Sequence, residues 1–140
     1  MKITVYTDGS YTQTDTPKVG WGYVILDENE NVLHEDCGVI VDEFIHSRNV
    51  TGELRAVMKA IAFCEKNGIR EIDLYHDYIG VRAWVNKVNG KYEWKANNEL
   101  TVGYRVYVET SSVKINFHKV KAHSKNKWND YVDKLAKKKF

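Results

Sequence analysis

Proline, cysteine and long apolar runs are all scarce in this sequence. Its 140 residues include one proline, nine glycines and two cysteines. So few prolines and glycines exclude collagen-like and low-complexity chains. No stretch approaches the roughly 18 consecutive apolar residues of a membrane-spanning helix. The first residues also lack the apolar core of a secretion signal, so we expect no membrane partner.

The two cysteines, Cys37 and Cys64, have no partner nearby in the sequence and no zinc-ligand spacing. We interpret them as free thiols in a reducing compartment and expect a cytoplasmic protein, with a disulfide as the minor alternative.

A large net charge is lacking as well, because the formal charge is only +2. The charges are nevertheless unevenly placed. Ten of the 21 Lys and Arg residues, but only three of the 19 Asp and Glu residues, lie between positions 103 and 140. This pattern fits a surface for a polyanion beside a cation-binding cluster. The alternative is a plain solvated face, which charge alone favours.

Hydrophobic periodicity predicts a single α/β domain over residues 1–140. Alternating, β-rich segments predict strands at 2–7, 19–26, 32–41, 71–76 and 113–120, with Asp8-Gly9-Ser10 as a turn after the first. Helical spacing predicts one helix from a Thr51 N-cap to Asn67-Gly68, and three more near 78–86, 97–109 and 127–138. The order βββαβααβα indicates a five-stranded mixed sheet with helices on both faces.

Four acidic residues occupy places from which the fold can bring them together. Asp8 and Asp77 each follow a predicted strand, Glu53 opens the first long helix, and Asp133 lies in the last helix. Converging carboxylates repel one another unless cations neutralise them, and oxygen ligands of this kind select Mg²⁺ or Mn²⁺. Two such ions about 3.5–4 Å apart activate a water and stabilise the leaving oxygen of a phosphodiester.

Each acid alone also has an ordinary explanation. Asp8 and Asp77 are typical turn residues. Glu53 is placed to offset a helix dipole. Asp133 is spaced for a surface ion pair with Lys137.

Five motifs in sequence order carry a resemblance to a known family. They are Tyr6-Thr7-Asp8-Gly9-Ser10, Asn49-Val50-Thr51-Gly52-Glu53-Leu54, Tyr75-His76-Asp77-Tyr78, Val120-Lys121-Ala122-His123, and Asn129 to Ala136 with Asp133 inside it. Along nearly its whole length the chain resembles type 1 ribonuclease H. The resemblance implies the ribonuclease H-like fold. It also implies an endonuclease that hydrolyses the RNA strand of RNA–DNA hybrids with two Mg²⁺ ions, leaving 3′-hydroxyl and 5′-phosphate ends.

The resemblance also assigns roles to residues. It implies that Asp8, Glu53, Asp77 and Asp133 bind the metals. Asp130 is a rival for the fourth place, although the Asn-x-x-x-Asp-x-Leu-Ala pattern fits Asp133. His123 is implied to assist proton transfer or product release, a role that suits a near-neutral pKa.

Substrate contacts follow from the same comparison and from charge. Gly9, Ser10 and Asn49 are implied to contact the minor groove, where the 2′-hydroxyl distinguishes RNA from DNA. Lysines that flank the site, namely Lys119, Lys121, Lys125 and Lys127, are placed to hold phosphates. Trp94 with Lys95 is placed to hold the backbone of the DNA strand, unless Trp94 is simply an aromatic residue of the core or of a satellite cluster.

The chain departs from the family pattern in several places. Tyr78 follows the third acid where Ser is common, Val50 replaces an Asn, and residues 85–97 leave no room for a full basic protruding helix. Two other functions stay open at this point: another nuclease of the same architecture, such as a junction resolvase or an exonuclease, and a non-catalytic nucleic-acid-binding domain. We expect a monomer.

Overall fold

A computed structural model describes residues 2–12, 17–40, 49–121 and 126–140, and of Asn49 the backbone alone. In chain order the elements are β1 (Thr4–Thr12), β2 (Lys18–Leu26), β3 (Val32–Ile40), α1 (Asn49–Lys66), β4 (Glu71–His76), α2 (Gly80–Ala83), β5 (Lys87–Val88), β6 (Lys91–Tyr92), α3 (Glu99–Thr110), β7 (Lys114–Lys119) and α4 (Lys127–Ala136). None of the described helices is long and apolar enough to cross a membrane.

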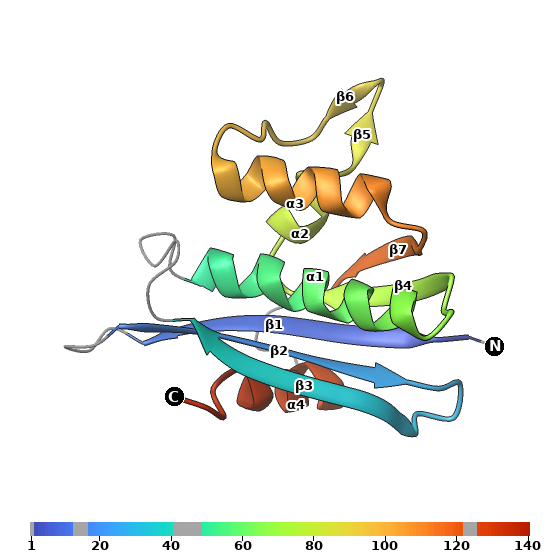
Figure 1. Cartoon of the computed structure of the whole chain (residues 1–140), viewed down its shortest axis with the longest axis vertical. Helices are drawn as coiled ribbons and strands as arrows, with labels where there is room; N and C mark the ends of the chain where they lie inside the picture. The colour runs from blue at the N-terminus through green and yellow to red at the C-terminus, as the bar shows by residue number, and fades with distance from the viewer. Residues whose placement is uncertain (1, 13–16, 41–48, 122–125) are drawn as a thin grey trace.

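The main sheet has five strands in the order β3-β2-β1-β4-β7. β1, β2 and β3 pair antiparallel, whereas β4 runs parallel to both β1 and β7. Helix α1 covers one face and α4 covers the other, with α2 and α3 on the α1 side (Figure 1). The predicted five-stranded mixed sheet with helices on both faces is therefore confirmed.

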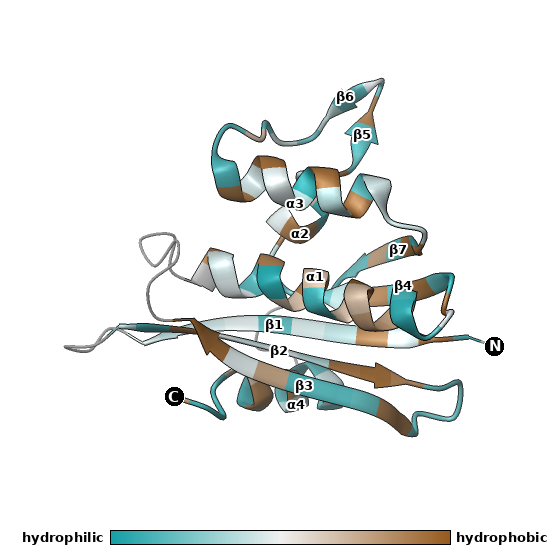
Figure 2. Ribbon diagram, viewed as in Figure 1, coloured by the Kyte–Doolittle hydropathy of each residue, from teal (hydrophilic) through white to brown (hydrophobic). Residues whose placement is uncertain are grey.

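Two apolar clusters hold the helices on the sheet, one on each face. Because successive side chains of a strand point to opposite faces, Val5 joins the cluster under α1, and Tyr6 joins the cluster with Trp128 and Val132 of α4. The apolar stretches that supply both clusters are visible along β2 and β4 in Figure 2. Burial of these side chains is the main force that fixes the positions of α1 and α4.

The structure corrects three local predictions. The expected turn at Asp8-Gly9-Ser10 is wrong, because β1 continues to Thr12 and pairs there with β2. Helix α1 begins at Asn49, so Thr51 is not its N-cap.

The helix expected near 78–86 is reduced to Gly80–Ala83, and a small β5–β6 hairpin follows it. Asn89 and Gly90 form the hairpin turn, with φ of 53° and 79°. Both lie in the left-handed region that a tight turn of this kind requires.

A candidate active site of clustered carboxylates

Three carboxylates from three separate segments meet at one edge of the sheet. Asp8 of β1, Glu53 of α1 and Asp77, directly after β4, each offer one oxygen, and these oxygens all lie within 4.8 Å of one another. Asp8 and Glu53 are almost fully buried, at 3% and 2% exposure, while Asp77 is half-buried. The arrangement matches the expected convergence of acids that are far apart in the sequence.

The parallel pairing of β1 with β4 brings two of these acids side by side. Tyr6 of β1 is level with Tyr75 of β4. Two residues further along, the same register places Asp8 level with Asp77. Asp77 therefore stands just past the carboxyl end of β4, and Asp8 lies beside it within β1, two residues beyond the last residue of β1 that pairs with β4. In α/β sheets, ligands commonly bind outside the carboxyl ends of such parallel strands.

Glu53 reaches this edge because α1 lies unusually close to the sheet at Gly52. A Cβ atom at residue 52 would lie 2.2 Å from the carbonyl oxygen of Gly20 and 3.1 Å from the Cα of Gly9. No side chain fits into that space, so only glycine allows the helix to contact the backbones of β1 and β2. The next residue, Glu53, is thereby held over Asp8.

Burial and mutual repulsion disfavour the charged forms of these acids. The pKa of Asp8 is raised chiefly by burial, and the charges of Asp77 and Asp133 raise it further. The pKa of Glu53 is raised well above its usual value by burial and then by the charges of Asp8 and Asp77. Within the described residues, no Lys, Arg or His forms an ion pair with Asp8, Glu53 or Asp77. In the part of the chain that the structure describes, no protein cation therefore neutralises these acids.

Asp133 lies at the rim of the cluster. Its side chain is 46% exposed, and its Oδ2 is 3.2 Å from Nζ of Lys137. It is close enough to Asp8 to raise the pKa of that carboxyl, an effect that Asp130 does not have. The geometry thus places Asp133, rather than Asp130, beside the other acids.

Helix α4 carries Asp133 and contacts β2 through a second glycine. A Cβ atom at Gly20 would lie 1.8 Å from the carbonyl oxygen of Ala136, so the helix backbone rests directly on the strand. Asn126 caps the start of α4 by accepting hydrogen bonds from the amides of Trp128 and Asn129, each 3.0 Å long. The cap and the glycine contact together fix where Asp133 stands.

The predicted substrate-contacting residues near the acids are placed as follows. Gly9 and Ser10 are buried within β1, and the Gly9 amide donates to Oδ1 of Asp8 at 2.9 Å. Lys121 is exposed just beyond β7. It lies at the same end of the sheet as Asp77, because β7 runs parallel to β4 and the Val120 amide donates to the His76 carbonyl at 2.7 Å. His123 and the side chain of Asn49 lie outside the described residues.

Trp94 belongs to a cluster of three aromatic rings. Its ring centroid is 5.2 Å from that of Trp84 and 6.1 Å from that of Tyr78, yet the residue keeps 37% of its surface exposed. It is therefore neither a core residue nor a free surface ring. Lys95, next to it, is exposed.

Two tyrosines near the acids, Tyr78 and Tyr104, were given no functional role from the sequence. Tyr78 and Tyr104 lie close enough to Glu53 for its charge to raise their pKa values, although burial is the larger cause for each. The Tyr104 hydroxyl also donates to the Val81 carbonyl at 2.6 Å. Tyr78 had a signal, because it directly follows Asp77 in a family motif, whereas no motif marks Tyr104.

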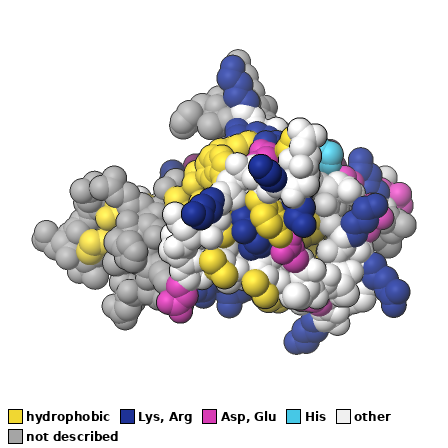
Figure 3. Space-filling view, turned by 90° about the horizontal axis from the view of Figure 1, so that it is seen from above, with side chains coloured by type: hydrophobic (Ala, Val, Ile, Leu, Met, Phe, Trp, Pro, Cys, Tyr) yellow, Lys and Arg dark blue, Asp and Glu magenta, His cyan; other side chains and the backbone are white. Residues whose placement is uncertain are grey.

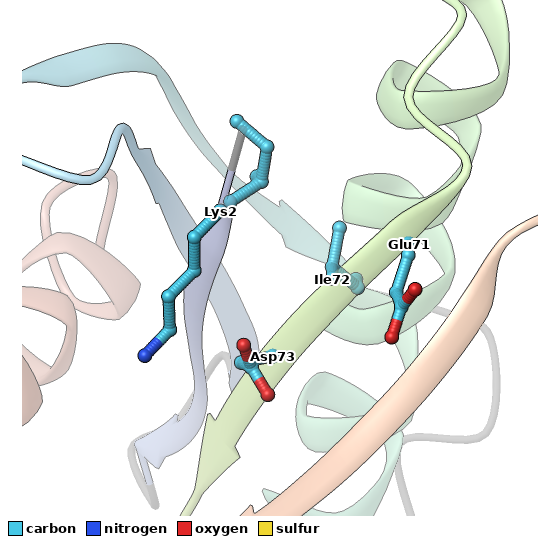
Figure 4. A pocket seen from close by; sticks show the side chains of 5 residues that line it. Lys2, Glu71, Ile72 and Asp73 are labelled. Carbon is cyan, nitrogen blue, oxygen red and sulfur yellow. The ribbon is translucent and has the colours of Figure 1, made fainter.

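One hollow of the structure lies away from the acids. This hollow of about 310 Å³ is lined by Lys2, Ile3, Glu71, Ile72 and Asp73 (Figure 4). These residues lie at the beginnings of β1 and β4, apart from Asp8 in the middle of β1 and Asp77 just after β4.

Comparison with known proteins places this geometry in a family. The sequence matches the RNase H family over residues 1–140. Ribonuclease H of Ehrlichia ruminantium is 33% identical over 97% of this chain and 92% of its own length. Ribonuclease H of Legionella pneumophila is 32% identical over 97% and 94%, respectively.

Solved structures agree with the fold. RNase H1 of Halobacterium salinarum has a TM-score of 0.75 at 19% identity, covering 99% of this chain and 96% of its own. LC11-RNase H1, solved in complex with an RNA/DNA hybrid, has a TM-score of 0.74 at 22% identity, covering 99% and 96%. Both share the ribonuclease H-like fold with this chain.

Proposed function

Because this chain belongs to the ribonuclease H family and so cleaves the RNA strand of RNA–DNA hybrids, we propose that Asp8, Glu53, Asp77 and Asp133 are the residues with which it does so. The supporting observation is the meeting of three carboxylate oxygens within 4.8 Å at one edge of the sheet. The proposed reaction is two-metal-ion hydrolysis that leaves 3′-hydroxyl and 5′-phosphate ends.

The donor set fits divalent cations bound through oxygen. Oε2 of Glu53 is buried and has no hydrogen-bond partner among the described residues. A buried carboxylate oxygen without a partner is costly unless a cation meets it. All the ligands offered are hard carboxylate oxygens, which favours Mg²⁺, with Mn²⁺ as a substitute, over zinc. When bound, two such ions activate water and stabilise the developing charge on the leaving oxygen.

The protein's own residues set the positions of these ligands. Glu53 and Asp8 hold the inner, water-poor part of the site, and Asp77 faces them from the end of β4. Asp133 is placed to close the outer side, where its ion pair with Lys137 is exposed and exchanges readily for a cation. His123 is the proposed group for proton transfer or product release.

The substrate contacts are also part of the proposal. Gly9, Ser10 and Asn49 would meet the minor groove of the hybrid, where the 2′-hydroxyls mark the RNA strand. Lys121 and Lys95, both exposed, would hold phosphates, with Trp94 against the DNA strand. Figure 3 shows Lys and Arg side chains bordering hydrophobic ones on the face that carries α3 and the β5–β6 hairpin. The solved complex of LC11-RNase H1 with a hybrid supports this class of partner.

A cleavage panel tests the proposal. The protein is incubated with Mg²⁺ and labelled RNA–DNA hybrid, double-stranded RNA, double-stranded DNA or a four-way DNA junction, each with and without chelator. We expect cleavage of the hybrid alone, in the RNA strand, with complete loss in chelator. Cleavage of the junction instead, or hybrid cleavage that persists in chelator, would refute the proposed metal-dependent reaction.

Three further expectations belong to the proposal. Residues 1–140 act as one catalytic domain and as a monomer. The protein works in the cytoplasm, where a hybrid substrate occurs and where Cys37 and Cys64, both buried free thiols, stay reduced. Light scattering after size-exclusion chromatography would measure the mass in solution.

A further inference from the structure

A single arginine donates hydrogen bonds to the backbones of two tryptophans, Trp84 and Trp94. Arg105 of α3 donates from Nε to the Trp84 carbonyl at 2.6 Å and from Nη2 to the Trp94 carbonyl at 2.8 Å. Trp84 and Trp94 are ten positions apart in the sequence, and neither lies within a helix or strand. The planar guanidinium fork thus sets the spacing between two backbone segments.

The guanidinium itself is held in place from the other side. Its carbon lies 3.5 Å from the centroid of the Tyr92 ring, which is the geometry of a stacked cation–π contact. The Tyr92 hydroxyl donates to Glu109, one helical turn beyond Arg105 on α3. The arginine is therefore pre-organised against both the hairpin and the helix.

Both tryptophans in turn contact Tyr78, which directly follows Asp77, the third proposed metal ligand. Trp84 and Trp94 both pack on the ring of Tyr78, with centroid distances of 6.0 and 6.1 Å. The three rings close around Gly80, where an added Cβ atom would lie 2.4–3.0 Å from all of them. A shift of either tryptophan therefore alters the aromatic surface next to Asp77.

We propose that Arg105 is a positioning residue for hybrid binding, which presents the exposed Trp94 ring to the DNA strand by fixing the backbones of Trp84 and Trp94. The inference rests on the proposed function, because it takes the hybrid as the substrate that meets Trp94. Two of the five N–H donors of the guanidinium go to protein carbonyls. Arg105 thus acts through the tryptophans, and the salt dependence of KM distinguishes this role from a phosphate contact.

Arg105→Lys tests this role, because it keeps the charge and removes the fork. Steady-state cleavage of a hybrid is measured at several salt concentrations and normalised to the folded fraction from circular dichroism. We expect KM to rise about tenfold, the scale of one lost charge-assisted hydrogen bond, with kcat within about twofold of wild type. The dependence of log KM on log salt should keep its slope, since no phosphate contact is lost.

Two comparison variants complete the experiment. Lys87→Met removes a charge 5.0 Å from the centroid of the same Tyr92 ring but no hydrogen bond to a tryptophan; we expect KM to stay within about threefold of wild type. In a Trp94→Leu background, Arg105→Lys should add no further rise in KM, because its effect runs through Trp94.

Several results would overturn the proposal. These are an unchanged KM with only a lower melting temperature, a shallower salt slope, and a full tenfold rise in the Trp94→Leu background. Should Arg105→Lys not fold, Tyr92→Leu, which removes the ring under the guanidinium, is judged by the same criteria. A wild-type protein that leaves every hybrid intact would instead refute the proposed function itself.

Discussion

Gly52→Ala should destabilise the protein and slow cleavage, although the same change in a helix is normally stabilising. In an exposed helix, replacing Gly by Ala gains about 1 kcal/mol. At residue 52, however, the new Cβ would stand 2.2 Å from the Gly20 carbonyl oxygen. Carbon–oxygen contacts of this kind settle near 3.3 Å, so α1 must retreat from the sheet by about 1 Å.

The retreat has two measurable costs. Overpacking of this size costs about 1–3 kcal/mol against a helix gain of about 1 kcal/mol, so we expect a net loss of up to about 2 kcal/mol. Glu53, the next residue, moves away from Asp8 and Asp77 by a similar distance. A misplacement of 1 Å at a reacting centre can reduce the rate by about 100-fold, and we expect kcat to fall by that order.

Gly103→Ala provides the matched control. Gly103 lies within α3, is exposed, and has no atom within 4 Å of where its Cβ would stand. This variant should gain up to about 1 kcal/mol and cleave at the wild-type rate. Urea denaturation measures stability, and single-turnover cleavage of a hybrid measures chemistry. If Gly52→Ala matched Gly103→Ala in both assays, the close contact of α1 with the sheet would not be what places Glu53.

Three further outcomes follow from the carboxylate cluster. Asp8→Asn and Asp77→Asn should each abolish cleavage while hybrid binding, measured by gel shift, is largely kept; a variant that cuts at the wild-type rate would remove that residue from the site. Asp133→Asn should lower kcat far more than Asp130→Asn, because only Asp133 is close enough to act on Asp8; equal effects would contradict this placement. Because the pKa values of Asp8 and Glu53 are raised in the folded protein, the metal-free form holds protons that the unfolded chain releases. The stability of the metal-free form should therefore fall from about pH 5 to about pH 8. The rise in melting temperature on adding Mg²⁺ should grow over the same pH range, since the ligands must be deprotonated. A Mg²⁺-induced rise in melting temperature that does not change with pH would contradict the raised pKa values.

The sequence was a good guide to elements that carry a strong pattern. Alternation located the strands, helical spacing located α1 and α4, and acids at the ends of two strands indicated where the site would form. The pairing of β1 with β4, which the convergence requires, was an assumption at that stage. β4 runs parallel to β1 because the chain crosses over through α1 before it enters β4, and parallel strands require such a crossover.

Other features were misjudged because local preference competes with tertiary pairing. Asp8-Gly9-Ser10 has turn-forming residues, yet β2 offers Gly22, Trp21 and Gly20 as partners and keeps it in the sheet. The hairpin at Asn89-Gly90 did have a signal, since Asn-Gly between short β-prone segments is a strong indication of one. Helical spacing nevertheless predicted a helix near 78–86 and no hairpin after it.

The contacts made by Arg105 had no signal of any kind. They join residues that are 11 and 21 positions apart, and they go to backbone carbonyls, which look the same in every sequence. Only the coordinates could show that one side chain reaches both tryptophans. The close approach at Gly52 was equally hidden, because a glycine in a helix is often no more than a weak position.

Gly20 touches both helices that bring acids to the edge of the sheet. Its carbonyl oxygen limits how near α1 can come, and the space where its side chain would be is filled by the carbonyl of Ala136 from α4. Gly20, which itself offers no ligand, therefore determines how closely α1 and α4 approach β2 from its two faces. Any side chain at this position would push α4 away from β2 and carry Asp133 away from the other three acids.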